Sequence, residues 1–179
     1  MKPETAPPLN ACPDNLSVDI DIGDEGWLAA IDDPEPLCAD LLQSVIGFLA
    51  LPPRAYEVSV VLTNDARQRE LNRDYRGRDS ATNVLSFPSE DPDNMDFPPE
   101  LPMPLGDITL ALETVTREAA EMSFRDHFCH LLVHGMLHLV GYDHETNTDA
   151  ACMEALEVRI LDARGIENPY ADSVVAGQN

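Results

Sequence analysis

The histidines of this chain are concentrated in one short stretch. All five lie between His127 and His144, and the stretch ends with His134-Gly-Met-Leu-His138-Leu-Val-Gly-Tyr-Asp-His144. His134 and His138 are four residues apart, so on a helix they project from one face, one turn apart. Two imidazoles in this arrangement can share one divalent cation. Their spacing therefore predicts a metal site.

A third ligand follows the helix. Gly141 is expected to end it, because a residue just past the last turn often needs a positive φ, which glycine tolerates. The chain then turns back, and His144 can supply a ligand from outside the helix. Three protein ligands leave one coordination position open, as in catalytic rather than structural zinc sites. We predict one zinc ion per chain, bound by His134, His138 and His144.

The other two histidines, His127 and His130, fall in the same sector of a helix that is otherwise apolar nearly all round. Such a helix is buried, and buried imidazoles need polar partners. For His130 two roles stay open, orientation of a ligand histidine or a place in the core. Cys129 precedes His130, but sequence neighbours do not face each other on a helix, so we expect its thiol to serve packing.

The histidine spacing also matches the metalloprotease pattern H-E-x-x-H-x-x-G-x-x-H, with one change. Gly135 stands where that pattern has the glutamate that serves as general base. A peptidase of the usual type would lack its base. The pattern therefore favours a different hydrolysis by metal-activated water.

Alternating and helical periodicities predict the elements that position these residues. The expected strands are 16–22, 56–63, 82–87 and 106–110. The expected helices run from Pro34 to about Leu49, from a cap at Asn64 or Asp65 to Tyr75, over 113–121, over 124–140, and from a cap at Thr146 or Asn147 to a stop at Gly165. Mixed strands and helices predict an α/β (mixed α+β) fold in one domain, a small sheet packed by about five helices, with the metal site on the penultimate helix and the following turn.

The boundaries of this domain come from composition. Residues 1–14 are rich in proline and are expected to form a mobile N-terminal tail, with the domain over 15–170 and a C-terminal tail over 171–179. The stretch 88–104 contains six prolines and several acids. We expect a solvated surface loop there, with a lid over the site as the alternative.

The overall composition is that of a soluble globular protein. Of 179 residues, 44% are hydrophobic, no apolar run is long enough to span a membrane, and the N-terminus lacks an apolar signal core. The four cysteines show no C-x-x-C pairing, so reduced thiols are expected. A cytoplasmic location follows as the expectation.

The charge is strongly acidic, with 11 Lys and Arg against 33 Asp and Glu and a formal net charge of −22. Phosphate backbones should repel such a chain at long range. Six of the basic residues nevertheless lie between Arg54 and Arg78. They could form a local patch for phosphate, or Arg67, Arg69 and Arg73 could simply solvate a helix face.

Four stretches together resemble a known family. They are Leu71-Asn72-x-x-Tyr75-Arg76-Gly77, Thr82-Asn-Val-Leu-Ser-Phe-Pro88, Leu105-Gly-Asp-Ile108 and the histidine stretch itself. In this order, from about Leu16 to Tyr170, the chain resembles the YbeY family of bacterial metal-dependent endoribonucleases of rRNA maturation. The resemblance implies a four-stranded sheet with the metal helix behind it.

The resemblance also implies a function. It implies cleavage of single-strand-type RNA in the maturation of the 16S rRNA 3′ end and in ribosome quality control, beside the small ribosomal subunit and its proteins, with no membrane partner. It makes Arg76 a functional residue with the three histidines, because guanidinium binds phosphate bidentately. The alternative for Arg76 is a structural ion pair with an acid such as Asp79.

Two other functions stay open at this point. They are a metallopeptidase that lacks the usual glutamate, and a non-catalytic ribosome-assembly factor whose metal only stabilises the fold. If the protein is an endoribonuclease, the metal could activate either water or the ribose 2′-OH. The acidic surface predicts that a partner delivers the RNA, and that the isolated protein binds RNA weakly and with steep salt dependence.

Overall fold

A computed structural model describes residues 15–89, 97–119 and 122–171. Within these ranges the chain forms four strands and six helices. The two expected tails lie almost entirely outside the described residues. The elements in chain order are β1 (Leu16–Ile22), α1 (Gly26–Ala30), α2 (Pro34–Phe48), β2 (Tyr56–Thr63), α3 (Asp65–Arg76), β3 (Val84–Pro88), β4 (Met103–Ala111), α4 (Leu112–Glu118), α5 (Phe124–Leu139) and α6 (Asn147–Asp162).

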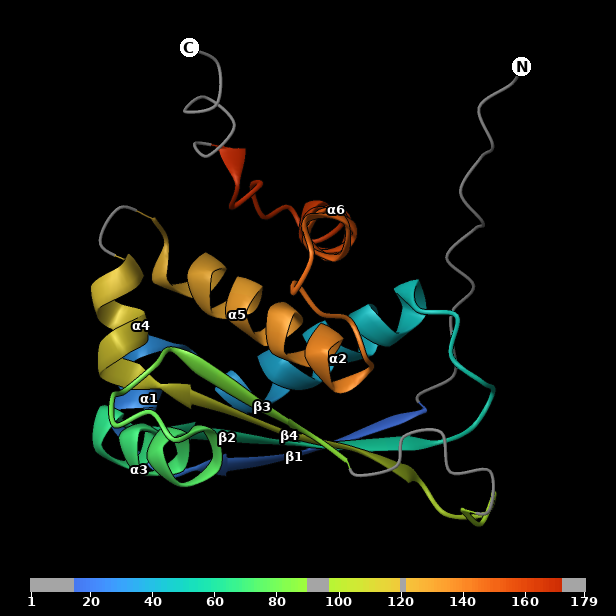
Figure 1. The fold of residues 1–179 in the computed structure, drawn as a ribbon, viewed down its shortest axis with the longest axis horizontal. Coiled ribbons are helices and arrows are strands. Elements are labelled where there is room, and N and C mark those ends of the chain that lie inside the picture. The colour runs from blue at the N-terminus through green and yellow to red at the C-terminus, as the bar shows by residue number, and fades with distance from the viewer. Residues whose placement is uncertain (1–14, 90–96, 120–121, 172–179) are drawn as a thin grey trace.

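The four strands form one mixed sheet in the order β1-β2-β4-β3. β1 and β4 both pair in parallel with β2, whereas β3 is antiparallel to β4 and forms one edge. Helices α2 and α5 pack on one face, with α6 outside them, and α3 lies on the opposite face (Figure 1). The predicted fold class is confirmed.

The hydrophobic core lies between the sheet and the layer of α2 and α5. Along β2 the alternate residues Val58, Val60 and Leu62 are buried against these helices. Helix α5 is buried over most of its length, as its apolar sequence predicted. The core therefore holds α5 rigidly against the sheet, and α5 carries two of the three predicted ligands.

The sequence prediction of five helices misses α1, a helix of five residues. So short a helix shows no periodicity. Its Trp27 is fully buried and donates its indole N–H to the Thr63 carbonyl at 2.8 Å. This contact fastens the chain between β1 and α2 to the end of β2.

Strand β4 begins at Met103, three residues before the predicted start. A bulge after Pro104 interrupts the alternation of apolar and polar residues by which the strand was predicted. At this bulge Glu57 pairs with Pro104 and the next residue, Val58, pairs with Gly106. Gly106 has φ +127°, and a Cβ there would lie 2.1 Å from the Phe87 carbonyl oxygen. Only glycine fits this bulge without displacing β3.

The predicted loop over 88–104 is therefore shorter than expected, since Pro88 belongs to β3 and residues 103–104 belong to β4. Residues 90–96 lie outside the described ranges. The end of the loop is held by Arg54, which donates to the carbonyls of Pro98 and Leu101. In the described part of the chain, every helix is too short or too polar to cross a bilayer.

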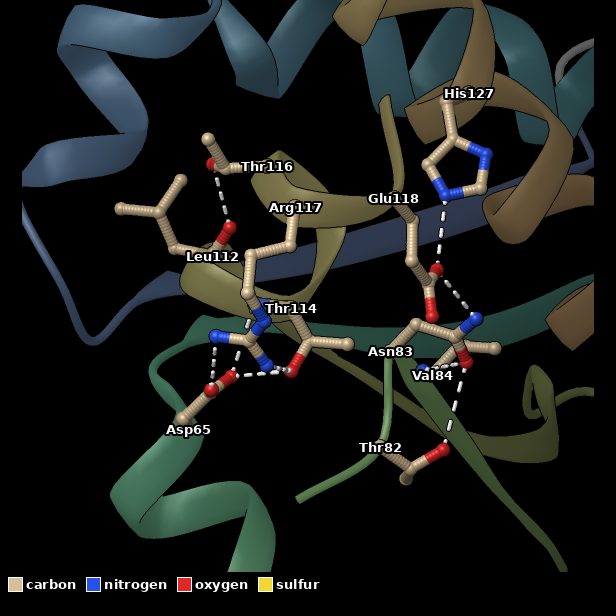
Figure 2. Close-up of polar contacts among 10 residues, drawn as sticks. All are labelled: Asp65, Thr82, Asn83, Val84, Leu112, Thr114, Thr116, Arg117, Glu118 and His127. Atoms are coloured by element: carbon tan, nitrogen blue, oxygen red, sulfur yellow. Dashed lines mark hydrogen bonds and ion pairs between the residues drawn. The ribbon is translucent and has the colours of Figure 1, made fainter. Parts of the chain in front are cut away.

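Helices α3 and α4 cap each other, although they are far apart in sequence. The Asp65 carboxylate of α3 accepts from the backbone N–H of Thr114 at 3.0 Å and from its hydroxyl at 2.7 Å, and it pairs with Arg117 (Figure 2). In return, the Glu113 carboxylate accepts from the backbone N–H of Asp65 at 2.8 Å. Each carboxylate satisfies an N–H at the first turn of the other helix.

Candidate metal centre

Helix α5 begins with the Ser123 hydroxyl, which accepts from the Asp126 N–H, and ends in a Schellman turn. Beyond it, Tyr142 N–H bonds the Leu137 carbonyl and Gly141 N–H bonds the His138 carbonyl, with Gly141 at φ +92°. This bond pattern requires the left-handed residue that glycine supplies. The predicted helix end at Gly141 is confirmed, and the reversal carries His144 back toward His138.

The three predicted ligands converge. One ring nitrogen from each of His134, His138 and His144 lies within 4.8 Å of the other two. The Nε2 atoms of His134 and His138 are 3.1 Å apart. His134 and His138 are half-buried and His144 is exposed, so the cluster opens to solvent on the side of the turn.

The protonation of these rings indicates what the cluster can bind. His134 Nδ1 lies 2.7 Å from a carboxylate oxygen of Glu157, which can only accept, so Nδ1 carries the proton and Nε2 a lone pair. Burial and the neighbouring His134 and His144 lower the pKa of His138, which favours its neutral ring. A cation between the rings would accept lone pairs from all three. Three imidazoles within this distance of one another fit a divalent cation such as zinc.

Glu157 of α6 is a residue of this site that sequence reasoning missed. Its side chain has no exposed surface, and it contacts His134, His130 and Tyr170. Burial raises its pKa, but hydrogen bonds from His130, His134 and Tyr170 outweigh burial and lower the pKa to about 2. The sequence held one signal that could have found it. Glu157 is four residues after Met153 and three before Ile160, so helical periodicity places this glutamate on the buried face of α6.

His127 is not part of the cluster. Its Nε2 lies 3.0 Å from a carboxylate oxygen of Glu118, and the same oxygen accepts from the Asn83 amide at 2.8 Å (Figure 2). This bond joins α5 to α4 and to the residue before β3. His127 is therefore a buried structural histidine, with a carboxylate partner rather than the backbone carbonyl of the usual core histidine.

His130 lies on α5 between His127 and His134. Its Nε2 is 3.2 Å from Glu157 and 3.1 Å from the Tyr170 hydroxyl, so it contacts the carboxylate that holds His134. The neighbouring Cys129 is buried, and burial raises the pKa of its thiol to about 11. This thiol is protonated and packed, as expected. Asp143 accepts from the His144 N–H at 2.7 Å and shapes the turn.

Arg76 is the last residue of α3 and is exposed. Its guanidinium lies 3.5 Å from the Ser86 carbonyl oxygen on the edge strand β3, and the Ser86 hydroxyl donates to the Gly135 carbonyl beside His134. Asp79 pairs with Arg69 instead of Arg76. Within the described ranges, no carboxylate lies within ion-pairing distance of Arg76.

The other arginines of α3 do not form a free basic patch. Arg67 pairs with Glu70 at 2.8 Å, Arg69 with Asp79 at 2.7 Å, and Arg73 with Asp74 at 3.0 Å. These side chains are more than half exposed. They correspond to the solvated helix face that the sequence left open as an alternative.

Position 135 faces the sheet rather than the cluster. A Cβ at Gly135 would lie 2.9 Å from Ile108 Cγ2 and 3.1 Å from the Ser86 hydroxyl. Glycine lets α5 approach β3 and β4 closely. The glutamate of the metalloprotease pattern has no space here, so a peptidase base is excluded at this position by packing.

Fold and site together define an α/β domain with a solvent-open cluster of three histidines, two on a buried helix and one on the turn after it. A profile of the family described as Endoribonuclease YbeY matches residues 29–165. The chain belongs to the YbeY family.

Curated members of this family are similar in sequence to this protein over most of its length. The Endoribonuclease YbeY of Paramagnetospirillum magneticum is 45% identical over 159 residues, covering 88% of this chain and 97% of the relative. That of Dinoroseobacter shibae is 45% identical over 174 residues, covering 91% and 95%. The solution structure of TM1509 from Thermotoga maritima covers 91% of this chain and 100% of its own, with a TM-score of 0.49 and 24% identity.

Proposed function

We propose that this protein is a metal-dependent endoribonuclease that acts in maturation of the 3′ end of small-subunit rRNA. The observation that carries the proposal is the convergence of the three histidine nitrogens within 4.8 Å at an open surface. Membership of a family described as endoribonucleases supports cleavage of RNA. A cytoplasmic site of action beside the small ribosomal subunit completes the proposal.

His134, His138 and His144 would hold one zinc ion per chain. Bound there, the ion supplies Lewis acidity toward a phosphoryl oxygen and lowers the pKa of water or of a hydroxyl group. The protein's own contribution is to present neutral imidazoles in fixed orientations. Helix α5 does this for two rings and the Asp143 turn for the third.

Arg76 would bind the phosphate that is cleaved. Negative charge grows on the phosphoryl oxygens in the transition state, and a guanidinium can donate two N–H groups to them. Among the described residues no carboxylate pairs with Arg76, and its guanidinium lies against β3, the strand that also contacts Gly135; both observations support this role.

The two alternative functions fit less well. A peptidase would need a base that packing at Gly135 excludes. A metal that only stabilises the fold usually has four protein ligands and a closed site, whereas the cluster found among the described residues has three histidines and opens to solvent. The net charge of −22 supports delivery of the RNA by a partner.

The test compares His138→Ala with His127→Gln in the zinc-loaded protein, on structured RNA and on casein, with and without chelator. His127→Gln is the matched control, because it alters the same helix outside the cluster. We expect RNA cleavage by wild type and control, none by His138→Ala, and a folded protein in every case. Casein cleavage, or unfolding on metal removal without any cleavage, would overturn the proposal.

A second comparison tests Arg76. Arg76→Ala removes the phosphate ligand, and we expect kcat to fall about 100-fold, the usual loss for one transition-state donor. Arg73→Ala, one turn earlier on the same helix face, should leave kcat within about twofold. Equal losses in both variants would mean that general charge, and not Arg76 itself, supports the reaction.

A further inference from the structure

Glu157 is the one carboxylate without exposed surface among the described residues. An ionised carboxylate in the interior is costly unless hydrogen-bonded groups surround it. Its partners come from two regions, His130 and His134 from α5 and Tyr170 from the end of the described chain. A residue placed only to fill the core between α5 and α6 would be apolar, as Met153 and Ile160 are.

The two carboxylate oxygens have separate partners. Oε1 is 2.7 Å from Nδ1 of His134, the predicted metal ligand. Oε2 contacts Nε2 of His130 at 3.2 Å and accepts from the Tyr170 hydroxyl, which itself lies 3.1 Å from His130 Nε2. One oxygen is therefore committed to His134, and the other is held in place by two groups that do not reach the cluster.

We infer that Glu157 is a positioning residue of the metal centre, and that His130 and Tyr170 hold it in place. The inference rests on the proposed metal site. By accepting from Nδ1, Glu157 keeps the proton of His134 on that nitrogen and directs Nε2 toward the position shared with His138. A carboxylate behind an imidazole also makes the ring a stronger ligand.

The same contacts explain the roles of the two other groups. His130 is in the sector of α5 that carries the ligands, yet its Nε2 is engaged by Glu157 and Tyr170. It therefore supports the site without binding the ion. Tyr170 packs its ring edge-on against His130, with centroids 5.4 Å apart, and so fastens the segment after α6 to the back of the site.

The first test is zinc affinity, measured with Zn²⁺ alone against a competing chelator in Glu157→Gln and Glu157→Met. Glutamine keeps one acceptor and loses the charge, whereas methionine keeps the approximate volume and loses both. We expect affinity to fall from wild type to Gln to Met, with a loss of about 10- to 100-fold for Met. Glu154→Gln, exposed on the same helix, is the control and should bind zinc as wild type does.

The second readout is the protonation of His134 in the metal-free protein, observed by ¹⁵N NMR. Wild type should carry the proton on Nδ1, and Glu157→Met should shift it partly to Nε2. A Met variant with wild-type zinc affinity, or with His134 still protonated only on Nδ1, would show that Glu157 serves packing alone. Neither readout uses RNA, so a failure of the proposed nuclease activity would be seen separately.

Discussion

At residue 135, glycine lies between two predicted metal ligands, His134 and His138, on a helix that is packed tightly against the sheet. A Cβ at this position would lie 2.9 Å from the Cγ2 atom of Ile108, a buried and β-branched side chain that cannot rotate away freely. The small residue is thus a packing requirement of α5. Because a side chain here would point into the sheet, position 135 could not supply the cluster with a carboxylate.

Gly135→Ala tests this packing. Overpacking costs about 1–3 kcal/mol and the helix gains about 1 kcal/mol from alanine, so we expect a net loss of about 1 kcal/mol in the free energy of unfolding in urea. Gly47→Ala in α2 is the matched control, since a Cβ there meets nothing within 4 Å. It should stabilise the protein by about 0.5–1 kcal/mol.

Gly135→Glu restores the metalloprotease pattern and separates sequence likeness from geometry. Its carboxylate would point at Ile108 and Ser86 instead of the cluster, so we expect a protein that does not fold and has no activity on casein. A folded Gly135→Glu protein that cleaves casein would contradict our account of this position.

At the scale of elements, the reciprocal caps join the first turns of α3 and α4, and α3 carries Arg76 at its other end. The Asp65 carboxylate is three-quarters buried, whereas its partner Arg117 is 63% exposed. An ion pair with so exposed a partner contributes little. The bonds from Thr114 therefore supply most of the stabilisation.

Asp65 also makes stability depend on pH. Burial raises the pKa of Asp65, but hydrogen bonds from Thr114 and Arg117 outweigh it, so the folded pKa lies below 3.8. A lowered pKa means that the carboxylate stabilises the fold above about pH 3.8 and that this contribution is lost as the pH falls further.

Asp65→Asn should therefore cost about 1 kcal/mol at pH 7, and the difference from wild type should shrink below pH 3.8. Urea unfolding of the metal-free proteins at several pH values measures it. Asp74→Asn, which alters an exposed pair on the same helix, serves as control. A difference that is constant down to pH 2 would assign the effect to shape rather than charge.

Several elements could be predicted from sequence because their signals are local. Periodicity located α2, α3, α5 and α6, and the caps Asn64 and Thr146 accept the bonds expected of them. The histidine cluster was predictable because two ligands share one helix and the third follows at once. Glu157 and the Asp65–Thr114 contact join residues far apart in sequence, and only packing decides which side chains meet. The short α1 and the bulge at Gly106 left no periodic signal.

For the whole molecule, the arrangement of charge matters more than its sum. The acidic surface led to the expectation of a steep salt dependence, but a steep dependence requires several free basic side chains that contact phosphate. Arg67, Arg69 and Arg73 are instead paired with carboxylates, and Arg54 holds the 97–102 segment. Few arginines remain to displace counterions from RNA, so the structure favours a shallow dependence.

We expect weak binding of the metal-free protein to single-stranded RNA. The slope of log K against log salt should have a magnitude of roughly 1–2, as for about two phosphate contacts. Fluorescence anisotropy measures it. Asp79→Asn should release Arg69 and steepen the slope by about 0.7, whereas Asp162→Asn on α6 should not. A wild-type slope of about 5 would mean that the RNA phosphates replace the carboxylates as partners of the arginines of α3.

The three predicted metal ligands are not held equally firmly, and this difference would affect the rates at which an ion binds and leaves. His134 and His138 belong to a helix locked into the core, whereas His144 lies on an exposed turn that begins at Gly141. Exposed turns open far more often than packed helices. An ion held by these three histidines would therefore bind and leave when the turn that carries His144 opens. Its residence time would be set by the opening of that turn and not by the lifetime of the native state.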